Sequence, residues 1–456
     1  MCFVGFKSVL NYKTVIQKTI YLPFMYRHHV SSLTLLLFCN LILIAQPKGD
    51  NLLSGILSAN SNSVFQQVVQ QPGTYRLQII YTQINRDKQN KPHFKNYYFN
   101  YDPQLYFNPA SMVKMPLAFL ALEKLNTLKA KGVDKYGIIQ YDSSAPWQHP
   151  LYKDTTEING LPSIAHLIKR AFLISENDPY NRLYQWVGQS ATNRSLHTKG
   201  YKDVRITRMF LGLSEEQNRH TNAIRFVDSK GALLFTQPAA YNKDSFDFSR
   251  TIKLGDAYMN RYDSIISEPF NFTKHNNISL GSMQQMLQSV LFPQSVPAKQ
   301  RFNLTTNDYI FLYRYLSQYP SETGNPKYDT SKFYDSYVKF FFRDSTRRMP
   351  DGVRVFNKVG WSYGFLTDVS YVVDFKNGLE YMLAATLYVN ADEILNDNKY
   401  EYDSIGYPFL YQLGQTIYRF EQERKRNYKP GLSAFKIKYE KRDPKDKRAS
   451  LSEVDN

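Results

Sequence analysis

Strand-like runs stand near both ends of this chain, and a long, mostly helical stretch separates them. Runs rich in aromatic and β-branched residues, which favour strands, cover residues 75–82, 93–99, 353–358, 368–374 and 381–389. The last two are joined by residues 375–378, where Asn-Gly accepts the positive φ of a hairpin turn. The predicted fold class is therefore α/β (α+β): an antiparallel sheet of about five strands from both chain ends, flanked by helices, beside an α-rich subdomain.

Helical periodicity and charge divide the chain further. Helices are expected at residues 50–71, 115–128, 163–174, 179–187, 306–318 and 405–426. Residues 190–345 show a mixed pattern rich in Asn, Asp and Ser, and the helical insertion is placed over about 115–345. The globular domain is expected to span residues 46–428. The charged segment 429–456 lacks apolar periodicity and is expected to be a mobile tail.

Residues 1–45 have the pattern of a signal peptide. Arg27 precedes an apolar run over residues 33–45, and polar residues follow. The run is short for a membrane-spanning helix, which needs about 20 apolar residues. Both cysteines, Cys2 and Cys39, lie in this leader, so the mature chain has no thiolate nucleophile and no cysteine-ligated metal. The protein is therefore expected to be exported, to the periplasm or the cell envelope.

The chain is basic, with a formal net charge of +17 and a pI near 9.4. Solubility together with a basic tail explains the excess of positive charge. A more specific alternative is that the tail contacts an anionic surface. The sequence has no Cys/His zinc spacing, no RNA-binding aromatic signature and no clear recognition helix. No nucleic-acid partner is therefore expected.

A serine and a lysine lie three positions apart in Ser111-Met-Val-Lys114, which opens an apolar helical stretch. At i and i+3 the two side chains share one helix face. A serine hydroxyl needs a nearby base, and backbone N–H groups in the first turn favour a developing oxyanion. Lysine serves as that base only if burial or nearby cations lower its pKa, which Lys358 or the helix end could do. Alone, the motif is weak, because chance matches are common in long chains.

Two further motifs follow in order. Ser175-x-Asn177 lies on a tight connection between two predicted helices, where side chains can project into a cleft. Lys358-Val-Gly360 ends a predicted strand. Each has an ordinary structural explanation, either a helix-terminating turn with local hydrogen bonds or a strand that ends at a flexible glycine beside a surface lysine. The order of the three motifs, each at a suitable element, indicates instead that they form one site.

This combination resembles the serine β-lactamase and penicillin-binding protein superfamily. Those proteins use Ser-x-x-Lys, Ser-x-Asn and Lys-Thr/Ser-Gly on a helix start, an inter-helix loop and a strand. The chain is most similar to the class A β-lactamases, through residues 358–368 and the hairpin that follows them. The resemblance covers roughly residues 50–425, and only the three motif blocks are specific.

The resemblance implies a role for each matching residue, and it implies no metal ion and no cofactor. The implied catalytic residues are Ser111, which is acylated, Lys114, which activates it, and Ser175, which relays a proton to the leaving nitrogen. The implied substrate-binding groups are Asn177 for the amide side chain, Lys358 beside Gly360 for the carboxylate, and the backbone N–H groups of Ser111 and Trp361 for the oxyanion.

Two departures from the family pattern bear on activity. Val359 replaces the hydroxyl residue of the third motif, which removes a hydrogen bond to a substrate carboxylate worth about 1.5–3 kcal/mol. Class A enzymes also need a glutamate that activates the deacylating water, and Phe210 stands where the loop after Thr207 would place it. Glu215 or Glu216 could substitute if the loop has shifted, and both are equally explained as solvated carboxylates. Without such a glutamate, the acyl-enzyme should persist.

The leading interpretation is an exported serine hydrolase of the class A β-lactamase-like type. It would act on β-lactams or related amides and esters through an acyl-serine intermediate, and its substrate would be a small molecule or derive from peptidoglycan. One alternative is a D-Ala-D-Ala peptidase or penicillin-binding protein-like acyl enzyme. A second is a non-catalytic binding module on the same fold, against which the presence of every motif side chain argues.

Overall fold

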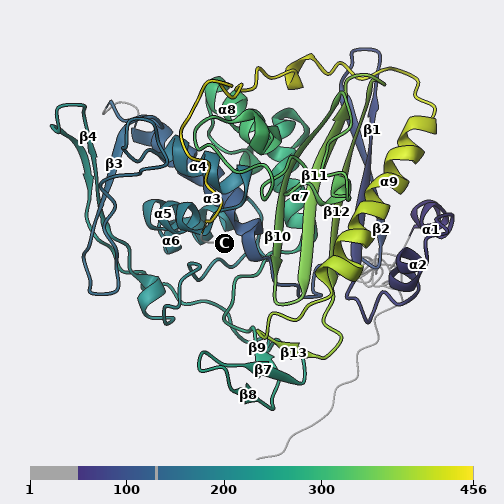
Figure 1. Cartoon of the computed structure of the whole chain (residues 1–456), viewed down its shortest axis with the longest axis horizontal. Helices are drawn as coiled ribbons and strands as arrows, with labels where there is room; N and C mark the ends of the chain where they lie inside the picture. The colour runs from purple at the N-terminus through teal and green to yellow at the C-terminus, as the bar shows by residue number, and fades with distance from the viewer. Residues whose placement is uncertain (1–49, 129–131, 455–456) are drawn as a thin grey trace, which may run out of the picture. The chain divides into compact units, whose positions relative to one another are not determined.

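The computed structural model describes residues 50–128 and 132–454, all of which belong to the compact unit Lys48–Asn456. Figure 1 shows how their helices and strands are arranged. The predicted leader, residues 1–45, with both cysteines, lies outside the described residues. Within the described part of the chain, no helix has both the length and the apolar character needed to cross a membrane.

An antiparallel sheet of five strands, in the order β10-β11-β12-β1-β2, forms the centre of the domain (Figure 1). Its strands are β1 (Gln78–Arg86), β2 (Pro92–Phe99), β10 (Val353–Ser362), β11 (Phe365–Asp374) and β12 (Leu379–Tyr388). Strands from the two ends of the chain meet where β1 pairs with β12, with Ile79 opposite Ala385. The turn between β11 and β12 is the predicted one, and its Gly378 has a φ of 63°. The predicted fold class is confirmed.

Both faces of the sheet are largely buried at β1, β10, β11 and β12, because alternate side chains of these strands enter two separate apolar cores, whereas the edge strand β2 is mostly half-buried or exposed. In β12, Met382 and Ala384 belong to the first core, whereas Leu383 and Ala385 belong to the second. The second core is closed by α1 (Asn51–Ser58), α2 (Ser63–Gln70) and α9 (Tyr407–Glu423). The first core takes in α3 (Lys114–Leu128), α4 (Ile164–Leu173), α5 (Asn177–Val187), α6 (Gln189–Thr198), α7 (Leu280–Leu291) and α8 (Thr306–Ser317).

The start and the middle of the domain differ from the prediction. The helix expected at residues 50–71 is two helices, because the Asn62 side chain accepts the Phe65 N–H at 2.9 Å and begins a new one. The insertion also contains short strands, which form three small sheets in the described part of the chain. These strands are β3 (Ile138–Asp142), β4 (Ala223–Val227), β5 (Leu233–Gln237), β6 (Lys253–Leu254), β7 (Ala257–Met259), β8 (Ile265–Ile266), β9 (Phe270–Asn271) and, later in the chain, β13 (Ile394–Leu395). Strands this short show too little alternation to be predicted.

The segment 429–456, for which a mobile tail is expected, packs along the domain wherever the structure describes it. Leu432 and Phe435 are buried in the first core. Glu440 pairs with Lys169 of α4 at 2.9 Å. A mobile tail is expected because the segment is highly charged and lacks apolar periodicity. The structure differs because a few buried apolar side chains and an ion pair are enough to hold the segment against the domain.

Candidate active site

A short 3-10 helix, Ala110–Val113, presents Ser111 at the start of α3. Ala110 has a φ of 44°, and its N–H donates to the Asn108 side chain at 2.9 Å, which holds this strained turn. Lys114 is the first residue of α3 and is fully buried. Its Nζ lies 2.8 Å from Ser111 Oγ. The i, i+3 spacing therefore brings the hydroxyl and the amine side by side.

The other two motifs meet Lys114 at the same place. Its Nζ contacts the Ser175 backbone O, and it lies 3.4 Å from Ser175 Oγ and 2.8 Å from Asn177 Oδ1. On the far side, Lys358 of β10 donates from Nζ to Ser175 Oγ at 2.7 Å. Ser111, Lys114, Ser175 and Lys358 thus form a continuous row of hydroxyls and amines, which we call the serine–lysine row.

The two lysines of this row are held in a setting that disfavours their charged forms. Burial lowers the pKa of Lys114 well below its usual 10.5, and the nearby Lys358 lowers it further, while Glu176 acts in the opposite direction. Burial also lowers the pKa of Lys358, against the attraction of Asp368. A lysine with a lowered pKa is neutral over more of the pH range, and only a neutral amine can accept the proton of the Ser111 hydroxyl.

Gly360 lets β10 approach the start of α3. A Cβ atom at this position would lie 2.5 Å from the Pro109 backbone O and 3.0 Å from Met112 Cγ, closer than side chains pack. The preceding residue, Val359, is fully buried in the second core. The side chain that departs from the family pattern therefore does not line the cavity described next, whereas Trp361 does.

A cavity of about 560 Å³ is lined by Ser111, Ser175 and Asn177 together with the segments 208–212, 275–276 and 361–363 and the side of the 396–402 loop that carries Asn396, Asn398, Tyr400 and Tyr402. Its volume lies within the range that small-molecule sites occupy. The described residues that line it include no Asp and no Glu, and Arg208 is the one Arg or Lys among them. The cavity therefore carries positive charge and lacks a carboxylate base.

Glu215 and Glu216, the candidates for a deacylating carboxylate, lie outside this cavity. Glu215 pairs with Lys274 at 2.7 Å, and its side chain is 41% exposed. Glu216 accepts the Tyr241 hydroxyl at 3.2 Å, and its side chain is 67% exposed. The structure thus does not bring these two carboxylates to Ser111, because the loop after Phe210 carries them to the surface.

Phe210 lines the cavity where the resemblance calls for the missing glutamate. Its ring stacks on Tyr180, with ring centroids 4.4 Å apart, and its centroid lies 5.3 Å from Lys114 Nζ. Its N–H donates to Asn181 Oδ1 at 2.8 Å, which fixes the backbone. An aromatic ring has no site that could accept a proton from water. The position is therefore occupied by a side chain that cannot activate one.

Glu176, the middle residue of the second motif, anchors the turn that carries Ser175. Ser175 has a φ of 71°, which is strained for a residue other than glycine. Glu176 is buried and accepts Arg170 Nη2 at 2.5 Å and the Tyr328 hydroxyl at 2.6 Å. Arg170 also pairs with Asp154 at 3.1 Å. Arg170 and Tyr328 could not be predicted from the sequence, because only the tertiary fold brings them to the motif. The acidic residue between Ser175 and Asn177 is the local sign that the motif needs a basic or hydroxyl partner.

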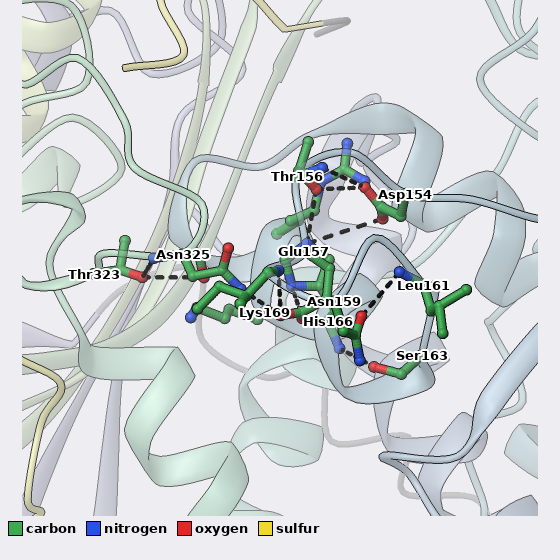
Figure 2. Close-up of polar contacts among 12 residues, drawn as sticks. Asp154, Thr156, Glu157, Asn159, Leu161, Ser163, His166, Lys169, Thr323 and Asn325 are labelled. Atoms are coloured by element: carbon green, nitrogen blue, oxygen red, sulfur yellow. Dashed lines mark hydrogen bonds and ion pairs between the residues drawn. The ribbon is translucent and has the colours of Figure 1, made fainter. Parts of the chain in front are cut away.

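A second arrangement of hydroxyl, nitrogen and carboxylate lies around His166 of α4 (Figure 2). His166 Nε2 lies 2.7 Å from Thr156 Oγ1, and His166 Nδ1 lies 2.7 Å from Glu157 Oε2. Thr156 donates its only hydroxyl proton to Asp154 at 2.5 Å, so its oxygen accepts from the imidazole. Asp154, Thr156, Glu157 and His166, which we call the His166 cluster, do not line the cavity of Ser111. We interpret the cluster as structural.

Comparison with known families agrees with this geometry. Residues 62–240 match the model of the beta-lactamase enzyme family. This match confirms the resemblance to the serine β-lactamase and penicillin-binding protein superfamily that the motifs predict. No curated protein matches the sequence of the chain.

Solved structures that are similar to this chain are β-lactamases of low sequence identity. One, from Xanthomonas campestris pv. campestris, is 12% identical, with a TM-score of 0.45 over 80% of this chain and 98% of that chain. A second, from Sphaerobacter thermophilus, is 14% identical, with a TM-score of 0.42 over 79% of this chain and 97% of that chain. A third, from Burkholderia vietnamiensis, is 10% identical, with a TM-score of 0.45 over 80% of this chain and 99% of that chain.

Proposed function

We propose that this protein is a serine hydrolase of the class A β-lactamase-like type, in which Ser111 forms an acyl-enzyme with β-lactams or related amides and esters. The observation that carries the proposal is the serine–lysine row. Lys114 Nζ lies 2.8 Å from Ser111 Oγ, and Lys358 Nζ lies 2.7 Å from Ser175 Oγ. Burial of two amines is unfavourable, and a binding module would gain nothing from it. The non-catalytic alternative is therefore disfavoured.

The row supports a simple route for the protons. Neutral Lys114 takes the proton of Ser111 as Oγ attacks the substrate carbonyl. The backbone N–H groups of Ser111 and Trp361 stabilise the oxyanion. The proton then passes from Lys114 through the Ser175 hydroxyl to the leaving nitrogen, and the bond from that nitrogen to the carbonyl carbon breaks. Asn177, which lines the cavity, holds the amide side chain of the substrate.

The acyl-enzyme is proposed to be long-lived. Its hydrolysis needs a base for the attacking water, and no Asp or Glu occurs among the described residues that line the cavity. Phe210 stands at the position of the expected glutamate, while Glu215 and Glu216 interact with surface side chains. These observations favour behaviour like that of a penicillin-binding protein, with D-Ala-D-Ala peptides among the substrates, over rapid β-lactam hydrolysis.

Intact-protein mass spectrometry during reaction with benzylpenicillin tests both parts. We expect the wild type to gain the mass of one penicillin and to keep it for hours after free penicillin is removed. Ser111→Ala should gain nothing, whereas Ser264→Ala, which changes an exposed serine that does not line the cavity, should react normally. A wild type that takes up no penicillin contradicts the choice of nucleophile. An adduct lost within seconds contradicts the long lifetime and favours a β-lactamase.

The proposal includes export to the periplasm or the cell envelope. The support is the leader-like pattern of residues 1–45. N-terminal sequencing of the protein from bacteria that express the chain should find a mature terminus near residue 46. A terminus at Met1 or Met25 in the accumulated protein would contradict cleavage of the leader.

A further inference from the structure

Arg208 is held at the wall of the cavity with its backbone fixed. Its carbonyl accepts the Tyr180 hydroxyl at 2.8 Å, and its N–H donates to Asn276 Oδ1 at 3.1 Å. Its Nη1 donates to His275 Nε2 at 2.7 Å. No Asp or Glu of the described part of the chain pairs with it, and none lines the cavity. The guanidinium therefore keeps its charge and most of its donors for a ligand.

The other cations near Ser111 are already engaged. Lys358 is buried, and its Nζ donates to Ser175 Oγ at 2.7 Å and to the Val359 carbonyl at 2.8 Å. Lys114 is fully buried within the row. Neither lysine lines the cavity. The carboxylate that the resemblance assigns to Lys358 thus meets no free cation on β10.

His275 adds no second charge to this wall. Burial and the charge of Arg208 lower the pKa of His275 to about 3, so the ring is neutral at pH 7. A guanidinium only donates, so the nearer ring nitrogen, Nε2 at 2.7 Å from Arg208 Nη1, accepts one of its protons. One positive charge with several N–H donors is the arrangement that suits a carboxylate.

We infer that Arg208 binds a carboxylate of the substrate, so that the loop at residues 208–212, rather than β10, selects acidic substrates. The inference rests on the proposed acyl-serine function. A substrate with a carboxylate gains a charge-assisted hydrogen bond here, whereas an uncharged one leaves the guanidinium partly desolvated and unpaired. Two kinds of substrate carry such a carboxylate: a penicillin, and a D-Ala-D-Ala peptide through its C-terminus.

The test measures the second-order rate constants for acylation of Ser111 by benzylpenicillin and by its methyl ester, and for its phosphonylation by an uncharged alkyl fluorophosphonate. Arg208→Ala should slow the reaction with benzylpenicillin by about 10- to 100-fold, and Arg208→Lys should restore part of it. The ester and the fluorophosphonate should change by less than about threefold. Lys274→Ala is the matched control, because it removes an exposed cation beside His275 that does not line the cavity.

The outcomes separate this inference from the function on which it rests. An unchanged rate with benzylpenicillin in Arg208→Ala overturns the inference, as does equal slowing with all three probes. A wild type that does not react with the fluorophosphonate at Ser111 overturns the proposed function itself.

Protection from the fluorophosphonate by a D-Ala-D-Ala peptide, compared with its C-terminal amide, tells the two sources apart. Better protection by the acid, lost in Arg208→Ala, supports a peptide carboxylate. Equal protection by acid and amide, with an Arg208-dependent penicillin rate, supports the β-lactam carboxylate.

Discussion

The serine–lysine row and the His166 cluster each place a hydroxyl beside a nitrogen base, and of these two only the row contributes to the lining of the cavity. In the serine–lysine row, Ser111 Oγ lies 2.8 Å from Lys114 Nζ, and Ser111 lines the cavity. In the His166 cluster, Thr156 Oγ1 lies 2.7 Å from the imidazole, and its proton is donated to Asp154. The first hydroxyl can lose its proton to the base beside it, whereas the second already uses its proton in a hydrogen bond.

The two clusters also differ in the charges that surround the nitrogen base, in addition to the difference in access to the cavity. The contacts of Lys114 Nζ are hydroxyl, carbonyl and amide oxygens, all uncharged, and the pKa of Lys114 is lowered. His166 instead has a carboxylate at 2.7 Å, that of Glu157, and a second at 3.9 Å, that of Asp154. A hydroxyl, a base and an acid in proximity therefore do not make an active site unless the hydroxyl keeps its proton for the base and is accessible to a substrate.

The largest expected effect comes from removing the base of the row. Lys114→Ala should slow phosphonylation of Ser111 by a fluorophosphonate by about 10²–10⁴-fold, the usual contribution of a general base. Stopped reactions analysed by intact mass give the rate. His166→Gln, which removes the other nitrogen base, should leave the rate within about threefold, since its cluster only supports the fold. A similar loss in both variants would contradict the contrast between the two clusters.

Introducing a carboxylate at Phe210 should change the lifetime of the acyl-enzyme. Phe210→Glu places a general base at the cavity wall and should speed loss of a penicillin adduct by about 10²-fold. Decay of the adduct mass after removal of free penicillin measures this rate. Phe210→Leu provides no base, and its adduct should last as long as that of the wild type. A Phe210→Glu adduct with unchanged lifetime would argue that more than this carboxylate is missing.

The two clusters should respond to pH in opposite regions. Lys114 must be neutral to act, so acylation should fall as pH falls through its lowered pKa, and it should level off well below the usual 10.5. Burial alone would raise the pKa of Glu157, but the hydrogen bond and charge of His166 lower it from 4.5 to about 2. Its contribution to stability is therefore complete above pH 4.5 and is lost as pH falls toward 2. Acylation rates and thermal unfolding across pH measure the two effects. An acylation rate that still climbs through about pH 10 would show an ordinary lysine.

The smallest effect concerns Tyr328, which supports the turn at Ser175 through Glu176. Tyr328→Phe removes the hydroxyl that donates to Glu176 at 2.6 Å and should lower the free energy of unfolding by about 1–3 kcal/mol. Arg170 still holds Glu176, so acylation should fall only severalfold. Denaturant unfolding and the acylation rate report the two effects separately. Unchanged stability would show that the turn at Ser175 does not depend on this contact.

The main sheet and the three motifs could be predicted from the sequence, because both depend on local patterns of residues. Apolar and β-branched runs indicate strands wherever they pair, and the motif spacings place Ser111 and Lys114 on one helix face. The cavity wall is different. Arg208 and Asn276 meet only through side-chain-to-backbone contacts across many residues of chain, and nothing local signals them. Glu215 is close to Phe210 in sequence, yet the intervening turn takes it to the surface.

The most direct test is to map where a fluorophosphonate attaches in the wild-type protein. Peptide mapping by mass spectrometry should find the label on Ser111 and none on Thr156, because only Ser111 combines a neutral base with access to the cavity. Label on Thr156, or no label on either residue, would contradict the assignment of the serine–lysine row as the active site.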